Sequence, residues 1–418
     1  MPNKLKIIND PVYGFIGIPH PLIFDLIEHP WFQRLRHIRQ LGMTHLVYPG
    51  AIHTRFHHAL GAMHLMTRAI DELRNKGNEI TEKQALGVTI AILLHDIGHG
   101  PFSHALEHSL AENVHHEDLS LILMQKLNEE FNGELETAIQ IFTNTYPKKF
   151  LHQLVSSQLD MDRLDYLMRD SFFTGVSEGV ISSDRIIKML QVVDDNLVVE
   201  EKGIYSVEKF IIARRLMYWQ VYLHKTVLSA EHILINILLR AKELVAKGEK
   251  LFASEALLWF LRNSPRKEDF YKSDTALKMF NCLDDSDIFG AIKDWQFNDD
   301  KALSLLCHHL VNRKLFRVEI STQKVGEQRL IKDRKLVAEK LGISLKQTEL
   351  FVFVNSIANN AYNPKSDKIF ILQRNGIVKD IAEAADQLNI SALSEPVVKY
   401  FYCYPKMETQ VSKIKNPD

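Results

Sequence analysis

The stretch that decides the predicted fold runs Ala91-Ile92-Leu93-Leu94-His95-Asp96-Ile97-Gly98-His99-Gly100-Pro101-Phe102-Ser103-His104. The apolar residues up to Leu94 are typical of a buried helix, and the glycines and proline after Ile97 end that helix. His95 and Asp96 must then be satisfied away from water, and a divalent first-row metal accepts both as ligands. For one histidine alone, a hydrogen-bonded core side chain beside a capping aspartate would be the better interpretation. The other ligand-type residues therefore decide.

Length and composition are those of an ordinary globular protein. The 418 residues are enough for one large core and a smaller domain. Hydrophobic residues make up 46% of the chain, and the net charge of -1 gives no basic field that would favour nucleic acid. The three cysteines are far apart, which argues against a disulfide framework or a thiolate zinc site. With neither a signal peptide nor a run of transmembrane length in view, we expect a cytoplasmic protein without a membrane partner.

Helical periodicity dominates up to about residue 313, and strand-like segments follow. Thr81 is predicted to be the N-cap of the helix that ends at His95, and one long helix is predicted over 207–247. A hairpin is expected to turn at 201–203. Further strands are predicted, from β-branched and aromatic enrichment, at 315–320, 350–354 and 369–372. We expect a mainly α fold: a helical core over residues 1–313 and a smaller α+β lobe over 314–418 that takes part in oligomer contacts.

Ligand-type residues recur in four widely spaced segments. In chain order these residues are His58, the pair His95 and Asp96, then His99, His104 and His116, and finally Asp162. Catalytic metal sites are typically built from ligands on several helices that converge in a bundle, with coordination positions left open for water. The spacing therefore favours a catalytic metal site over a set of isolated core histidines.

The order His…His-Asp…Asp resembles the HD-domain phosphohydrolase superfamily. The flanking motifs resemble its bacterial and animal dNTP triphosphohydrolases, the group that includes the animal sterile-alpha-motif/HD-domain dNTPase. The motifs that carry this resemblance lie within about residues 5–235 and are Asn9-Asp10-Pro11, Phe32-Gln33-Arg34-Leu35-Arg36, Tyr48-Pro49-Gly50-Ala51, the stretch 95–104 and Met161-Asp162-Arg163-Leu164-Asp165-Tyr166. The resemblance implies an HD-domain helical bundle and hydrolysis of dNTP to deoxynucleoside and intact triphosphate, by attack of water on the α-phosphorus.

The resemblance also implies the metal ligands and the catalytic residues. His58, His95, Asp96 and Asp162 would hold one tightly bound divalent metal, for which Mn, Fe, Zn or Mg is suited, and Mg can accompany the triphosphate. Such a metal lowers the pKa of a bound water and polarises a phosphoryl oxygen. The residues around the scissile bond would be His99, His104, Glu107 and His116, with His104 as the general acid toward the leaving 5′-oxygen. Glu107 stands where the family has aspartate, which lengthens this relay by one methylene.

Substrate-binding residues follow from the same correspondence. Arg55 lies one turn before His58 on the same predicted helix face, where a guanidinium can bind phosphate. Arg163, Tyr166 and Arg214 match further phosphate-contacting positions, although structural ion pairs are the alternative for the two arginines. The positions that hold the 3′-hydroxyl and crowd out a 2′-hydroxyl are matched by Gln40, Leu41, Asp170 and Tyr222. Leu41 and Tyr222 could equally be core residues, and Leu223 replaces a glutamine near the base, which leaves the base preference open.

A nucleotide activator site between subunits is the last implied feature. The matching positions are Lys6, Asn9, Glu28, Gln33 and Arg36, and the implied activator is dGTP or GTP; surface charges and a capping asparagine are the alternative. The expected assembly is a homodimer or homotetramer. The remaining histidines near the motifs, His53, His57, His108 and His115, are interpreted as bystanders on the helix surface or around the site.

Two other functions remain open at this point. An HD-domain phosphodiesterase or nucleotidase would use the same chemistry on cyclic nucleotides, (p)ppGpp or nucleoside monophosphates. A nucleotide sensor would bind dNTP without much turnover, although the intact ligand set argues against this alternative.

Overall fold

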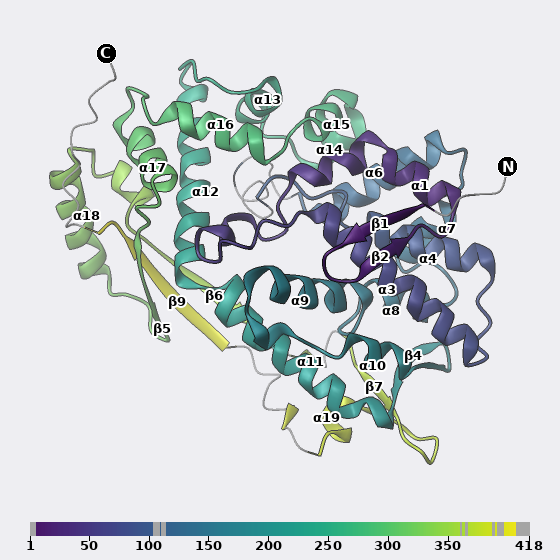
Figure 1. The fold of residues 1–418 in the computed structure, drawn as a ribbon. Helices are drawn as coiled ribbons and strands as arrows, with labels where there is room; N and C mark the ends of the chain where they lie inside the picture. The colour runs from purple at the N-terminus through teal and green to yellow at the C-terminus, as the bar shows by residue number, and fades with distance from the viewer. Residues whose placement is uncertain are drawn as a thin grey trace.

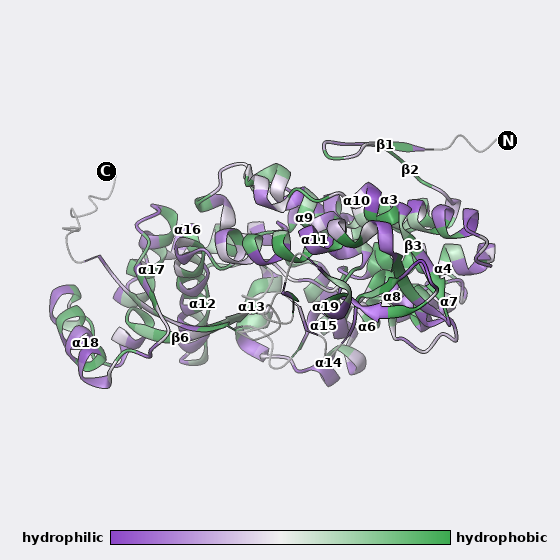
Figure 2. Ribbon diagram, turned by 90° about the horizontal axis from the view of Figure 1, so that it is seen from below, coloured by the Kyte–Doolittle hydropathy of each residue, from purple (hydrophilic) through white to green (hydrophobic). Residues whose placement is uncertain are grey.

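The computed structural model describes residues 6–102, 109, 114–359, 362–363, 367–386, 389–390 and 397–406. Within these residues the fold is mainly helical, with a smaller sheet-containing C-terminal region, as the sequence predicts (Figure 1). No helix in the described ranges is both long and apolar enough to cross a membrane. Figure 2 shows hydrophilic and hydrophobic residues mixed along the outer helices, for example along α18 (Glu327–Leu341).

The first half of the described chain forms an N-terminal hairpin and a helical bundle. Its elements are β1 (Ile7–Asp10), β2 (Gly14–Gly17), α1 (Pro21–Glu28), α2 (Pro30–Gln33), η1 (Arg34–His37), η2 (Gly42–Leu46), α3 (Arg55–Asn75), α4 (Glu82–Leu94), α6 (His116–Glu130), α7 (Glu136–Phe142), α8 (Lys149–Val155), α9 (Met161–Thr174), η3 (Ser177–Gly179) and α10 (Ser183–Lys188). Helix α3 packs against both α4 and α9. Three of the four predicted ligand segments are thereby brought into neighbouring helices (Figure 1).

Helix α4 is positioned by its own sequence. Thr81 Oγ1 accepts a hydrogen bond from Gln84 N at 3.2 Å, and Thr81 N donates to Gln84 Oε1 at 3.0 Å, which together form a capping box at the predicted N-cap. All residues from Gly87 to Leu94 are buried, so the helix runs through the core. The burial brings the end of α4 to the centre of the bundle.

The turn after α4 depends on Gly98. A Cβ atom at this position would overlap with backbone atoms of His116 and Ser120 in the first turns of α6. Gly98 N donates to Ser120 Oγ at 2.9 Å, and this hydroxyl donates in turn to His95 O at 2.6 Å. The close approach and the two hydrogen bonds fix α6 against the His95-Asp96 turn.

The second half of the described chain continues with helices and then short strands. Its elements are β3 (Leu190–Val193), β4 (Asn196–Glu200), η4 (Glu201–Gly203), α11 (Ile204–Met217), the π-helix η5 (Tyr218–Tyr222), α12 (Lys225–Ala246), α13 (Glu255–Asn263), α14 (Lys267–Lys272), α15 (Asp274–Asn281), α16 (Asp285–Trp295), α17 (Lys301–Val311), β5 (Arg317–Ser321), α18, η6 (Gln347–Leu350), β6 (Phe353–Asn359), β7 (Phe370–Leu372), β8 (Val378–Asp380), α19 (Ile381–Ala384) and β9 (Val397–Tyr404). The predicted strands near 317, 353 and 370 are present, with shifted ends.

Two predicted elements differ from the structure. The single helix expected over 207–247 is interrupted, because the chain widens into the π-helix η5 and restarts at Lys225. The expected hairpin is displaced by one strand: β4 pairs backwards with β3, through a turn at Asp194 and Asp195, which both have positive φ. The segment expected as the second strand begins α11 instead.

The strands of the C-terminal region belong to two sheets. One has the order β5-β9-β6 and packs against α12 through β5. In the other, β7 runs parallel to β4 and β8 completes the order β3-β4-β7-β8. Residues after 314 thus pair directly with a strand of the helical core, and a domain boundary near 314 stays a prediction.

A Gly61→Ala substitution tests how tightly α3 and α9 pack. The added Cβ would overlap with the Asp165 carboxylate and the Arg169 guanidinium, both fully buried. We expect a loss of about 1–3 kcal/mol in the free energy of unfolding, as for other overpacked core sites. The measurement is urea or thermal unfolding followed by circular dichroism.

Gly290→Ala is the matched control. Gly290 lies in α16 with nothing within 4 Å of the added Cβ, so the substitution should stabilise the protein by up to about 1 kcal/mol through helix propensity. Equal stability changes in the two variants would contradict the packing described here.

Candidate metal centre and active site

Three ligand atoms converge where α3, the end of α4 and the start of α9 meet. His58 Nε2 lies 3.4 Å from His95 Nε2 and 3.1 Å from Asp162 Oδ1, and 3.6 Å separates His95 Nε2 from Asp162 Oδ1. All three atoms lie within 4.8 Å of one another, which suits a single metal ion. The His58 side chain has no exposed surface, whereas the Asp162 side chain keeps 28% of its surface exposed. The group is therefore embedded on one side and reachable from the other.

Asp96 lies between this group and Arg55. Its Oδ1 atom is 3.3 Å from His95 Nε2 and 3.3 Å from His99 Nε2. Its Oδ2 atom accepts a hydrogen bond from Arg55 Nη1 at 2.5 Å and lies 3.8 Å from His58 Nε2. A metal held by His58 and His95 would have this carboxylate within reach, and the Arg55 guanidinium beside it.

The far nitrogens of both histidines are fixed by hydrogen bonds. His58 Nδ1 pairs with Asp165 Oδ2 at 2.7 Å, and His95 Nδ1 pairs with Ile92 O at 2.6 Å. Because these acceptors require a proton on each Nδ1, both Nε2 atoms face the site and would be the atoms that bind a metal once their protons are displaced. Metal-ligating histidines are oriented in this way in proteins, by a carboxylate or a carbonyl oxygen. The arrangement therefore fits a divalent metal.

Asp165 belongs to a buried charge network that connects the site with the N-terminal hairpin. Arg169 donates through Nε and Nη2 to the two oxygens of Asp165, both at 3.0 Å, and through Nη1 to Asp10 Oδ2 at 2.8 Å. The sequence motifs contain Asp10 and Asp165, and Arg169 lies three residues after the last motif, but none of the three was predicted as a site residue. The i, i+4 spacing of Asp165 and Arg169 is the signal that could have indicated their pairing.

The electrostatics of the group favour positive charge. Burial alone would keep His58 neutral, but hydrogen bonds with Asp162 and Asp165 raise its pKa to about 10. Burial also opposes ionisation of Asp162, yet His58 and His95 hold the pKa of this carboxyl well below its usual range. The carboxylates thus stabilise positive charge on the imidazoles, and a divalent cation that displaces the imidazole protons would supply that charge in their place.

His99 and His116 lie on the other side of Asp96. Their rings stack with centroids 3.8 Å apart, which follows from the close approach of α6 at Gly98. Burial and the positive charge of Arg55 hold the pKa of His99 well below its usual range. The other two predicted catalytic residues, His104 and Glu107, lie outside the described residues.

One face of α9 presents a row of predicted site residues. Asp162, Tyr166 and Asp170 follow one another at i, i+4 and i+8, so their side chains share a face over about 12 Å of helix. Tyr222 closes this row, because its ring meets that of Tyr166 edge-on at 6.2 Å and its hydroxyl donates to Asp170 Oδ2 at 2.7 Å. Burial and the Asp170 charge raise the pKa of Tyr222 well above its usual range, so this hydroxyl stays a donor.

Asp170 has a second partner that sequence reasoning did not assign. His53 Nε2 pairs with Asp170 Oδ1 at 2.8 Å, and the His53 side chain is buried. His53 is therefore not on a helix surface, one of the two bystander positions expected for it.

The remaining predicted substrate residues have mixed surroundings. Arg163 donates to Ser157 O at 2.6 Å, contacts Asp160 at 3.2 Å, and lines a polar cavity of about 380 Å³ together with Lys149 and His152. Leu41 packs against the hydrophobic core. Arg163 thus forms the structural ion pair that was the alternative interpretation, and it also lines a cavity.

Several buried polar atoms in this region lack a hydrogen-bond partner among the described residues. They are Gln40 Oε1, His53 Nδ1, His99 Nδ1 and Arg214 Nε. Leaving such atoms unpaired costs free energy, so natural proteins retain them mostly where a ligand or water completes them. All four belong to predicted site residues or lie next to one.

The predicted activator residues come from several elements: Lys6 precedes β1, Asn9 lies in β1, Glu28 ends α1, Gln33 ends α2 and Arg36 lies in η1. Arg36 donates to Gln33 Oε1 at 2.7 Å, and the Lys6 ammonium lies 3.0 Å from the centre of the Phe24 ring. Glu28, at the end of α1, and Asn9, in β1, are exposed. Gln33 is thus hydrogen-bonded to Arg36, and the Lys6 side chain packs on Phe24 of α1.

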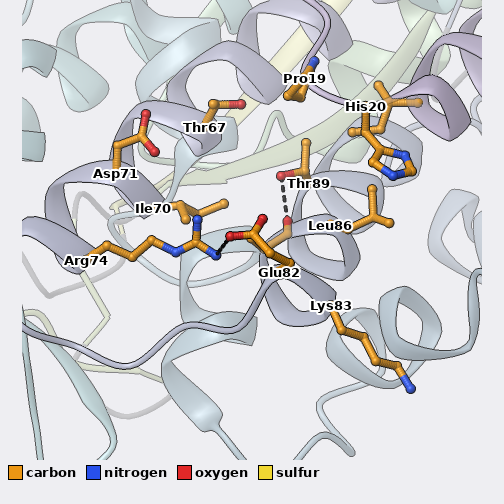
Figure 3. Close-up of a pocket in the computed structure, with 12 residues that line it drawn as sticks. Pro19, His20, Thr67, Ile70, Asp71, Arg74, Glu82, Lys83, Leu86 and Thr89 are labelled. Atoms are coloured by element: carbon orange, nitrogen blue, oxygen red, sulfur yellow. Dashed lines mark hydrogen bonds and ion pairs between the residues drawn. The ribbon is translucent and has the colours of Figure 1, made fainter. Parts of the chain in front are cut away.

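A separate hollow of about 350 Å³ lies between α1, α3 and α4 (Figure 3). Its wall includes Ile23, Ile70 and Leu86, and Arg74 and Glu82 form an ion pair of 3.0 Å beside it. None of the predicted site residues lines this hollow, so it is distinct from the candidate metal centre.

The convergence of His58, the His95-Asp96 pair and Asp162 in a helical bundle defines a hydrolase of the HD class. An HD domain is matched by residues 55–170, and an HD associated region by residues 181–269. The chain belongs to the HD-domain phosphohydrolase family. It is 33% identical to the uncharacterized protein YwfO of Bacillus subtilis over 389 residues, 90% of this chain and 87% of that protein. The crystal structure of a Bacteroides thetaiotaomicron phosphohydrolase is 55% identical, covers 96% of this chain and 100% of that chain, and has a TM-score of 0.94.

Relatives named as dNTP triphosphohydrolases confirm the resemblance seen in the motifs. The human deoxynucleoside triphosphate triphosphohydrolase SAMHD1 is 30% identical over 303 residues, 61% of this chain and 48% of the human protein. The SAMHD1 homolog of Dictyostelium discoideum is 32% identical over 265 residues, 59% of this chain and 51% of that protein. These alignments span about half the length of each relative.

Metal content tests the ligand group. We expect the purified protein to carry a divalent metal, and His58→Ala and Asp162→Ala to lose most of it, because each removes one of the three converging ligand atoms. Inductively coupled plasma mass spectrometry on the purified variants gives the measurement. His57→Gln is the control, since His57 bonds to Thr54 at the helix cap and glutamine suits that position. Unchanged metal content in both ligand variants would rule out this site.

Proposed function

We propose that this protein is a metal-dependent dNTP triphosphohydrolase that converts dNTP to deoxynucleoside and triphosphate. One observation carries the proposal: a single face of α9 presents Asp162 beside the two histidines and, two turns further on, Asp170 bonded to Tyr222. A metal-ligand group and a hydrogen-bonded carboxylate two turns further along the same helix face suit the α-phosphate and the sugar of one nucleotide. The human and Dictyostelium relatives, named for this activity, support the same substrate class.

The residues around the group divide the work. A bound divalent metal would supply an activated water and polarise a phosphoryl oxygen. Arg55, held by Asp96 beside the ligand atoms, can bind phosphate oxygens in the forked geometry of a guanidinium. Arg163, with Lys149 and His152 around the polar cavity, can bind the phosphates farther from the sugar. In the proposed reaction the water oxygen forms a bond to the α-phosphorus, the bond between the α-phosphorus and the 5′-oxygen breaks, and His104 protonates that oxygen.

At the sugar, Asp170 and Gln40 would bind the 3′-hydroxyl, while Tyr222 and Leu41 would leave no room for a 2′-hydroxyl. Activation by dGTP or GTP at Lys6, Asn9, Glu28, Gln33 and Arg36 between subunits of a dimer or tetramer belongs to the same proposal. The hydrogen bond between Arg36 and Gln33 and the contact of the Lys6 ammonium with Phe24 of α1 support this part of the proposal.

Product analysis decides between this function and its alternatives. Each dNTP and rNTP is incubated with Mn²⁺ or Mg²⁺, singly and in mixtures containing dGTP, and products are separated by anion-exchange chromatography. We expect deoxynucleoside and intact triphosphate from dNTPs only, and faster turnover in mixtures that contain the activator. Release of monophosphate or free phosphate, or turnover of rNTPs or diesters alone, would contradict the proposal and favour another HD-domain chemistry.

Asp96→Ala separates an enzyme from a nucleotide sensor. Loss of this carboxylate removes a neighbour of His58, His95 and Arg55. We therefore expect kcat to fall by more than about 100-fold, which exceeds the effect typical of residues that only hydrogen-bond to metal ligands. Nucleotide binding is followed in parallel by equilibrium dialysis. A variant that turns over dNTP like the unmodified protein would exclude the proposed role of Asp96.

A further inference from the structure

We propose that His53 is a positioning residue for recognition of the 3′-hydroxyl, because it holds Asp170 and Gln40 in fixed positions relative to each other. The inference rests on the proposed function and adds to it a residue that does not itself touch the substrate. His53 lies in the loop before α3, two residues ahead of Arg55, and its side chain is 1% exposed.

The His53 ring is held by a stacking contact and by a hydrogen bond. It stacks on Phe173 with centroids 4.5 Å apart and planes inclined by 19°, and Phe173 follows Asp170 by three residues on α9. Its Nε2 atom is 2.8 Å from Asp170 Oδ1, whereas its buried Nδ1 has no partner among the described residues. The neutral ring with the proton on Nε2 therefore leaves the fewest polar atoms unsatisfied. His53 donates, and Asp170 accepts.

Asp170 is thereby clamped from two elements. His53, in the loop before α3, donates to one carboxylate oxygen, and Tyr222, in the π-helix η5, donates to the other at 2.7 Å. Each oxygen of an ionised carboxylate accepts more than one hydrogen bond, so both retain capacity for a substrate hydroxyl. The two donors fix the plane in which that remaining capacity points.

The main chain of His53 also contacts Gln40, the second residue proposed to bind the sugar. Gln40 N donates to His53 O at 3.0 Å, next to the bridge between Arg39 and Thr54. The Gln40 Oε1 atom is buried without a partner among the described residues. One residue thus fixes Asp170 by its side chain and Gln40 by its backbone, and these two residues are the ones proposed to bind the 3′-hydroxyl.

The role predicts a specific kinetic signature. A site built to bind a hydroxyl rejects the analogue that lacks it, because its polar groups are then left unpaired. Without the His53 donor, Asp170 Oδ1 loses one partner and the carboxylate can rotate. Turnover of the dNTP should suffer, whereas turnover of the 2′,3′-dideoxy analogue, which cannot use Asp170, should change little.

The experiment compares kcat/KM for the fastest dNTP and its 2′,3′-dideoxy analogue in four variants. His53→Ala removes the ring, and His53→Phe keeps the stacking on Phe173 but removes the donor. For both variants we expect kcat/KM for the dNTP, divided by kcat/KM for the dideoxy analogue, to fall by about 10- to 100-fold. This is the effect of one hydrogen bond to a charged group. His53→Gln, whose amide can donate from a similar reach, should restore part of the ratio. His57→Gln should leave it unchanged.

The outcomes are distinguishable. An equal decrease for both substrates would show that His53 acts only in packing, and an unchanged ratio in both His53→Ala and His53→Phe would show that it does not position Asp170; either result overturns the inference. If the unmodified protein hydrolyses dNTPs but does not discriminate against the dideoxy analogue, the 3′-hydroxyl assignment fails and the inference with it. If the unmodified protein hydrolyses no dNTP in any mixture, the proposed function itself fails.

Discussion

The buried fork between Arg169 and Asp165 is the interaction on which the rest of the site depends. Neither side chain has exposed surface, and burying such charges is tolerated only when every donor and acceptor is matched. Arg169 meets Asp165 and Asp10, and Asp165 also fixes His58, so α3, α9 and the N-terminal hairpin share one network. Gly61 gives the network its space. The orientation of His58 therefore depends on three chain segments, and a change in any of them would alter that orientation.

A second constraint fixes the opposite side of the site. Gly98 lets α6 approach the His95-Asp96 turn, and Ser120 then joins the two by hydrogen bonds. The stacking of His116 on His99 is a consequence of that approach. The network around Asp165 fixes His58, and the contact at Gly98 fixes the His95-Asp96 turn, so the two histidines are held from different sides. The ligand side chains consequently have few alternative rotamers, which is the preorganisation a catalytic metal site requires.

The local features of the fold could be predicted from the sequence, whereas the long-range pairings could not. The cap at Thr81 and the buried helix to Leu94 depend on neighbouring residues, and periodicity shows them directly. Partners such as Asp10 for Arg169, or His53 for Asp170, lie more than one hundred residues apart, and no pattern indicates them. The break at η5 is similar: the segment has helical periodicity, but the Tyr222 bond to Asp170 and the Tyr48 bond to Gln220 O accompany the wider turn.

Helix α9 separates the structural role from the substrate role by its two faces. Asp165 and Arg169 point into the buried network, and Asp162, Tyr166 and Asp170 form the row at the proposed substrate site. Because both sets stand on one rigid helix, the distance between the metal ligands and the residues proposed to bind the sugar is fixed by helical rise and not by a loop. Selectivity for a nucleotide of given length would then be built into the same element that orders the ligands.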